Sequence, residues 1–251
     1  MRRSIVLFAR SPEREASAKR MRFAAPLFRA LIASWLDAAR RHHATPVIAC
    51  AADDRDALAS IAPEIEREWI EQRGDSFGER VAHATDETFK RGFDAVLVAA
   101  IDAPPHDLAA AFASLERGIP VISPSRDGGI NFIGLVQPEP ELLARLELHR
   151  RDLVHVCKRH FRNAGVPPAG QAASPPPGGE TPPAQPPGTA AFHVICGSID
   201  VDNESALAIA RTDRAWRWLL IATSAAQPRN RVTAQPVDAL ARASRAPPQF
   251  V

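Results

Sequence analysis

The sequence predicts an α/β protein with an open, mostly parallel central sheet and helices on both faces. Three observations support this fold. Short runs rich in β-branched residues alternate along the chain with longer segments of helical periodicity. Several of the short runs are apolar throughout, which is typical of strands covered by helices on both faces. The chain has 251 residues, 45% of them hydrophobic, which is enough to fill the core of one large domain.

Six short segments are predicted as strands because each is apolar and bounded by turn-forming or polar residues. They are 4–9, 46–52, 94–102, 119–124, 130–136 and 192–197. Helices are expected between them, where apolar residues recur at helical spacing. The clearest are 27–43 and 76–93, and the second ends near Gly92, a residue type that commonly stops a helix.

The composition predicts one domain with two segments outside its core. We expect residues 1–223 to form the domain, with an insertion at about 165–191 that is too rich in Pro and Gly to add a strand or a packed helix. We interpret the insertion as a linker, with a lid as the alternative. Residues 224–251 are expected to form a disordered tail.

Charge and cysteine content exclude several classes of function. The chain has 31 Lys and Arg against 29 Asp and Glu, and the basic residues are scattered, so nucleic acid is not expected as a partner. Its three cysteines are far apart and form no C-x-x-C pair, which argues against a disulfide framework or a zinc knuckle. No segment approaches the roughly 18 apolar residues of a membrane span, and the apolar run after Met1 is too short for a signal peptide. We therefore expect a soluble, cytoplasmic protein.

Carboxylates follow two of the predicted strands, in "AAIDAPP" and "CGSIDVDNES". Asp102 ends an apolar run, a position that suits a ligand of Mg²⁺ or Mn²⁺, although an Asx turn before proline would also explain it. Asp200 and Asp202 leave the last predicted strand, and an extended chain would place both on one side. Asp202 or Asn203 could instead cap the helix that follows.

The stretch "SRDGGINFIGL" places a carboxylate and two glycines before a predicted strand. Gly128 and Gly129 permit backbone conformations and close approaches that a Cβ would block, which would leave Asp127 beside a gap wide enough for a ligand. A hairpin turn leading into the strand is the alternative.

Two further stretches suit phosphate binding. In "RGDSFGERV", Ser76 and Glu79 have the spacing of a capping box, which leaves Asp75 and Arg80 beside a helix N-terminus that favours anions. In "FARSPEREASAKRM", a strand is followed by a loop and helix start that carry several cations, and such a loop can hold a nucleotide diphosphate. They are Arg10, Arg14, Lys19 and Arg20. A solvated basic loop is the alternative. No Ser, Cys and His arrangement suggests a covalent nucleophile.

The order of these stretches resembles a known family. "FARSP", "RGDSFGERV", "IDAPP", "SRDGGINFIGL" and "DVDNESAL" are similar to the motifs of the GT-A type glycosyltransferase-like proteins of the radical-SAM/selenodomain-associated transferase group, a bacterial family related in fold to nucleotide-sugar transferases and nucleotidyltransferases. The resemblance covers residues 1 to about 210. It implies a GT-A, Rossmann-like fold and a nucleotide or nucleotide-sugar donor.

The resemblance also implies residue roles. Asp102, helped by Asp202, would hold Mg²⁺ or Mn²⁺. Arg10 and Arg20, with Lys19 in the same loop, would bind the donor phosphates. Asp127 would act at the acceptor side, and Gly128 and Gly129 would let the chain pass close to the transferred group.

The first loop departs from the family pattern P-x-x-G-x-x-K-T-R-L. Glu15 replaces the glycine, Ala18 replaces the lysine, and Lys19 is displaced by one position. A carboxylate near a phosphate site is unfavourable, so the loop indicates an unusual donor or a site that has lost activity.

Two functions follow: a metal-dependent transferase, with glycosyl transfer favoured over nucleotidyl transfer, or a non-catalytic binding or scaffold protein of the same fold. The two differ in whether Asp102 and Asp202 converge on one point.

Overall fold

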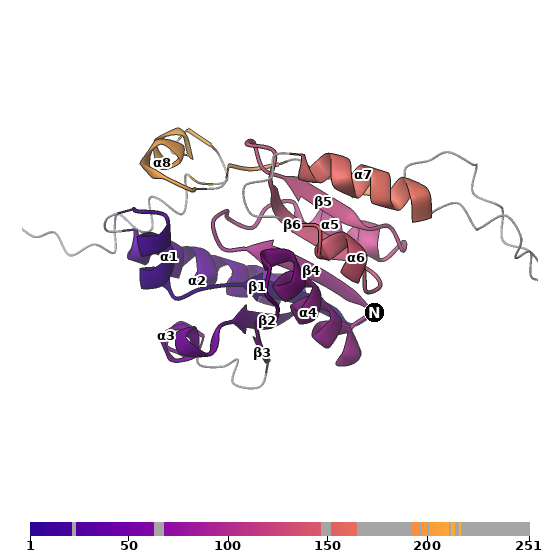
Figure 1. The fold of residues 1–251 in the computed structure, drawn as a ribbon, viewed down its shortest axis with the longest axis horizontal. Helices are drawn as coiled ribbons and strands as arrows, with labels where there is room; N and C mark the ends of the chain where they lie inside the picture. The colour runs from indigo at the N-terminus through magenta and orange to yellow at the C-terminus, as the bar shows by residue number, and fades with distance from the viewer. Residues whose placement is uncertain are drawn as a thin grey trace, which may run out of the picture.

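The computed structural model describes residues 1–21, 24–62, 68–146, 152–164, 192–195, 197–199, 201–210, 212, 213 and 216. The predicted insertion at 165–191 and tail at 224–251 lie outside these residues, as does Asp200. The described chain forms an open seven-stranded sheet in the order β3-β2-β1-β4-β6-β5-β7 (Figure 1). The predicted α/β fold with a mostly parallel sheet is confirmed.

Each of the six predicted strand segments overlaps an observed strand, and a seventh, β3, was not predicted. The strands are β1 (Arg3–Phe8), β2 (Thr45–Cys50), β3 (Trp69–Glu71), β4 (Ala95–Ala100), β5 (Val121–Pro124), β6 (Ile130–Leu135) and β7 (His193–Val194). β1 lies between β2 and β4 and is parallel to both. β6 runs antiparallel to β4 and to β5, so the sheet is mixed on this side.

Helices pack on both faces of the sheet because successive strand residues point to opposite sides. Ile5 and Leu7 pack in a cluster with α2 (Ala25–Arg41) and α5 (Leu108–Leu115). Val6 packs in a second cluster with helices of the other face. These are α4 (Phe77–Lys90), α6 (Pro140–Leu143) and α7 (Leu153–Ala164). The remaining helical elements are α1 (Pro12–Ala18), the 3₁₀ turn η1 (Ala52–Asp54), α3 (Arg55–Ala59) and α8 (Glu204–Ala210).

A third buried cluster joins the start of the chain to its last described residues. It brings together Ala16 and Met21, which lie in and just after α1, Phe28 of α2, and the later residues Val201 and Trp216. The indole Nε1 of Trp216 donates a hydrogen bond to the carbonyl oxygen of Ile199 at 2.8 Å. Figure 1 shows α1 and α8 at the same end of the molecule.

The N-terminus of α4 has the predicted capping box. The Ser76 hydroxyl accepts a hydrogen bond from the Glu79 amide at 3.1 Å, and the Glu79 carboxylate accepts one from the Ser76 amide at 3.0 Å. Gly78 lies against the end of α6, where a Cβ would come within 2.5 Å of the Ala144 carbonyl oxygen. This glycine therefore allows close packing of two helices.

Among the described residues, every helix is too short or too polar to cross a lipid bilayer.

Candidate functional site

The candidate site lies at the carboxyl ends of the parallel strands β1 and β4. The chain leaves β1 to form β2 on one side and later returns to form β4 on the other side. Crevices at such a reversal of strand order are where open α/β sheets usually bind ligands. A cavity of about 430 Å³ opens here, with Phe8, Arg10, Lys19, Phe77, Arg80, Asp102, Asp127 and Asp202 among its lining residues.

A backbone hydrogen bond brings the two predicted metal ligands together. Asp102 follows β4, and its carbonyl oxygen accepts a hydrogen bond from the Val201 amide at 2.9 Å. Val201 itself is fully buried in the third cluster. Asp202, the next residue along the chain, is therefore held beside Asp102 although 100 residues separate them in sequence.

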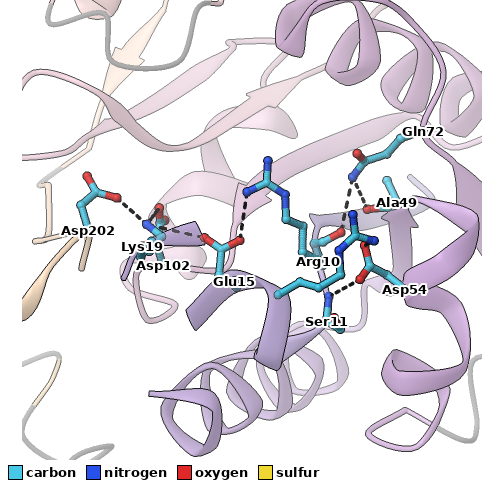
Figure 2. Close-up of polar contacts among 11 residues, drawn as sticks. Arg10, Ser11, Glu15, Lys19, Ala49, Asp54, Gln72, Asp102 and Asp202 are labelled. Carbon is cyan, nitrogen blue, oxygen red and sulfur yellow. Dashed lines mark hydrogen bonds and ion pairs between the residues drawn. The ribbon is translucent and has the colours of Figure 1, made fainter. Parts of the chain in front are cut away.

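The ammonium of Lys19 lies between these two carboxylates (Figure 2). Its Nζ is 3.0 Å from Oδ2 of Asp102, pairs directly with Oδ1 of Asp202, and is 3.6 Å from Oε1 of Glu15. Only 11% of the Lys19 side chain is exposed. Burial by itself lowers the pKa of Lys19, but the carboxylates of Asp102 and Asp202 more than offset this and raise the pKa above its ordinary value. Lys19 is therefore a permanent cation in this site.

Glu15, which replaces the glycine of the resembled motif, lies on the wall of the cavity between two cations. Its carboxylate is 3.6 Å from Lys19 Nζ and 3.7 Å from Nη1 of Arg10. Burial raises the pKa of Glu15, and the nearby Asp102 adds to the rise, while Lys19 and Arg10 oppose it. The Glu15 carboxylate on α1 therefore neutralises part of the positive charge of Arg10 and Lys19.

The arrangement of these side chains does not fit a divalent cation as they lie. The position between Asp102 and Asp202, where the cation is predicted, is taken by the ammonium of Lys19. In the described part of the chain, no group of three His, Cys, Asp or Glu side chains could hold a metal ion. A divalent ion could use the Asp102 and Asp202 carboxylates only after Lys19 had left them. The Mg²⁺ or Mn²⁺ ion therefore stays a prediction.

Asp127 and the two glycines after it form the turn of the hairpin between β5 and β6, as the alternative interpretation of "DGG" expects. Oδ1 of Asp127 accepts hydrogen bonds from the Ser125 hydroxyl and from the Gly129 amide, the second at 3.0 Å. Gly128 has a φ of +97°, a conformation that favours glycine. Asp127 and Gly129 also line the cavity, so the turn and the ligand position are compatible.

The remaining predicted residues are divided between this cavity and its surroundings. Arg80 lines the cavity from the first turn of α4. Asp75 does not line it, and its amide donates to the Glu79 carboxylate at 2.8 Å. Arg20 is exposed and borders a neighbouring cavity of about 650 Å³, whose lining also includes Lys19, Asp127 and Asp202.

Two positioning residues were missed in the sequence. Asp54 is fully buried, and its carboxylate accepts hydrogen bonds from the Ser11 amide and from Nη1 of Arg14, both at 3.0 Å, which fixes the start of α1. Gln72 lines the cavity, and its side-chain amide donates to the Ala49 carbonyl oxygen at 2.8 Å. Asp54 comes shortly after a predicted strand, the signal that identified Asp102, whereas Gln72 follows β3, which the sequence did not predict.

Comparison with known proteins gives a family match over part of the chain. Residues 35–149 match the model of a family described as "Uncharacterized protein conserved in bacteria (DUF2064)". No curated protein matches the sequence.

Several solved structures are similar to this one. A protein from Desulfovibrio desulfuricans G20, provisionally named a nucleotide-diphospho-sugar transferase, is 20% identical, with 90% of this chain and 96% of that chain covered and a TM-score of 0.66. A 4-diphosphocytidyl-2C-methyl-D-erythritol synthase from Anaerococcus prevotii DSM 20548 is 11% identical, with 87% of this chain and 98% of that chain covered and a TM-score of 0.42. The chain therefore has the fold of the Desulfovibrio protein, and residues 35–149 match a family found in bacteria.

Proposed function

We propose that this protein is a transferase that takes a sugar from a nucleotide-activated donor and passes it to the hydroxyl of a small acceptor. The observation that carries the proposal is the convergence of Asp102 and Asp202 on one point at the edge of the cavity. The two carboxylates come from distant parts of the chain and line the same cavity as Arg10, Arg80 and Asp127. The convergence therefore favours the transferase over a non-catalytic scaffold.

The cavity offers distinct surroundings for the parts of such a donor. Phe8 and Phe77, whose rings meet edge to face with centroids 5.3 Å apart, form an apolar wall suited to a nucleobase. Arg10 and Arg80 line the cavity and supply positive charge for a diphosphate. Asp127 lines the cavity at the β5–β6 turn, where an acceptor hydroxyl would approach.

The proposed reaction is a displacement at the anomeric carbon of the donor sugar. The acceptor oxygen forms a bond to that carbon, the bond from the carbon to the diphosphate oxygen breaks, and the nucleoside diphosphate leaves with the electron pair. Asp127 would receive the proton of the acceptor hydroxyl as general base. The arginines would stabilise the negative charge on the leaving diphosphate. Nucleotidyl transfer is the second candidate, because the same cations suit a triphosphate donor.

Calorimetric titration tests the donor site directly. UDP, GDP, CDP, ADP and their sugar conjugates would be titrated into the wild type, Arg80→Met and Arg117→Met, each with MnCl₂ and with EDTA. Arg117 is an exposed arginine after α5 that does not line the cavity, so it is a control for the lost charge. We expect one nucleotide to bind the wild type and Arg117→Met, with affinity for Arg80→Met lower by about tenfold or more.

Two results of this titration would overturn the proposal. If no nucleotide binds under either condition, the protein has no donor site, and the scaffold function replaces the transferase. If a nucleotide binds Arg80→Met and the wild type equally, it does not occupy this cavity.

A further inference from the structure

The Lys19 ammonium is held in a defined position, unlike a mobile lysine on a protein surface. Lys19 ends α1, whose start is fixed by the buried carboxylate of Asp54 and whose Ala16 packs in the third cluster. Its side chain is 11% exposed and contacts three carboxylates that come from α1, from the end of β4 and from the segment before α8. The fold therefore places the ammonium at the point where Asp102 and Asp202 converge.

Two carboxylates that converge on one point repel each other unless a cation lies between them. A divalent ion or an ammonium can supply that charge, and in this chain the ammonium is present.

We propose that the ammonium of Lys19 is the resident cation of the Asp102 and Asp202 pair, in the place that a divalent metal ion would otherwise take. Its biochemical consequence rests on the proposed function: the donor binds without a divalent ion, and its diphosphate is neutralised by arginines of the cavity wall. Lys19 contacts neither the transferred group nor the acceptor in this scheme. It is a positioning residue that keeps two carboxylates together and excludes a metal.

Binding of Mn²⁺ alone tests the inference without any nucleotide. Free Mn²⁺ would be followed by electron paramagnetic resonance during titration into the wild type, Lys19→Met, Lys90→Met and the double variant Lys19→Met/Asp102→Asn. Lys90 is the matched control, because it also pairs with two carboxylates, Asp86 and Glu87, but on the exposed surface of α4. Circular dichroism would verify folding, and Lys19→Gln would replace Lys19→Met if that variant does not fold.

We expect one Mn²⁺ to bind Lys19→Met at least about tenfold more tightly than the wild type, because metal binding to the wild type requires the rarely populated state in which Lys19 has left. Lys90→Met should behave as the wild type, and the double variant should lose the site. Equal Mn²⁺ affinity of wild type and Lys19→Met would overturn the proposal. Failure of both to bind would also overturn it, since the pair would then not be a metal position at all.

The nucleotide experiment separates this inference from the proposed function. If a nucleotide binds the wild type equally in EDTA and in MnCl₂, both ideas are supported. If binding requires Mn²⁺, the donor site stands and the role of Lys19 as resident cation is wrong. If no nucleotide binds, the proposed function fails, while the Mn²⁺ titration still decides what lies between Asp102 and Asp202.

Discussion

The thiol of Cys157 is fully buried on α7, in the same apolar cluster as Phe161 and Leu153. Burial raises the pKa of Cys157 to about 12, and burial is also the largest cause that raises the pKa of Cys50 to about 11. The reactive form of cysteine is the thiolate, so both residues should be inert in the folded protein at ordinary pH.

We expect Cys157 to resist alkylation by iodoacetamide at a pH of about 8 and to react once the protein is unfolded. Its folded pKa is raised, so the stability that it contributes is complete below the unfolded pKa of about 8.5 and is lost as pH rises toward its folded pKa. Peptide mass spectrometry after alkylation measures the first effect. Denaturant titrations at neutral and alkaline pH measure the second, with Cys157→Ala as the control that should lose less stability at high pH. Alkylation at the rate of the unfolded chain would contradict this prediction.

At the level of single residues, the sequence predicted which side chains lie near the cavity better than it predicted which side chains contact one another. The departure at Glu15 was visible as a carboxylate in place of a glycine, and the candidate residues Asp102, Asp127 and Asp202 were singled out because they follow strands or precede one. That Lys19 lies among three carboxylates was not predictable, since it depends on residues 83 and 183 positions further along the chain. Local patterns contain no information about which distant charge lies opposite.

The contact between α4 and α6 depends on the missing side chain of Gly78. A Cβ at this position would lie 2.5 Å from the carbonyl oxygen of Ala144 and 2.6 Å from that of Leu143. Both obstacles are backbone atoms, which cannot rotate away as a flexible side chain could. Gly78, the second glycine of "RGDSFGERV", therefore has a structural role, separate from the phosphate role proposed for Arg80.

We expect Gly78→Ala to lower the free energy of unfolding by about 1–2 kcal/mol, because the cost of overpacking exceeds the gain in helix propensity. Urea denaturation followed by circular dichroism measures the change. The double variant with Ala144→Gly should not recover the loss, because the Ala144 carbonyl oxygen remains in place. Unchanged or higher stability of Gly78→Ala would show that the two helices can move apart.

The elements themselves were largely predictable, and the exceptions have physical reasons. The six predicted strands and the helices α2 and α4 have strong apolar patterns. β3 was missed because its three residues, Trp69–Glu71, are too few to establish a period. The antiparallel direction of β6 was not specified either, because an apolar run has the same pattern in both directions. Only the "DGG" turn indicated the hairpin, and its other interpretation was left open.

The third cluster packs the last described residue of the chain against its first helices. Trp216 is fully buried there, in the same cluster as residues of α1 and α2. This packing, with the hydrogen bond from Trp216 to Ile199, holds the segment that carries Asp202 against the rest of the fold. Trp216 lies within the predicted domain, whose boundary at residue 223 stays a prediction.

We expect Trp216→Ala to lower the free energy of unfolding by about 3–5 kcal/mol through the lost packing of a large buried side chain. Trp69→Ala is the control, because Trp69 is only half-buried and should cost less. Denaturant titration measures both. In a Lys19→Met background, Trp216→Ala should also weaken Mn²⁺ binding, because Asp202 is no longer held beside Asp102. A loss for Trp216→Ala no larger than that for Trp69→Ala would mean that the cluster does not anchor this segment.

The hydrogen bond from Val201 to Asp102 has a consequence for the order of events on the ribosome. A nascent chain that has reached only residue 164 already contains the strands β1 to β6 and both Lys19 and Asp102. Of the three carboxylates that contact the Lys19 ammonium in the full chain, such a chain contains only those of Asp102 and Glu15. The ion pair of Lys19 with Asp202 forms only after Val201 and Asp202 have been translated and have docked beside Asp102.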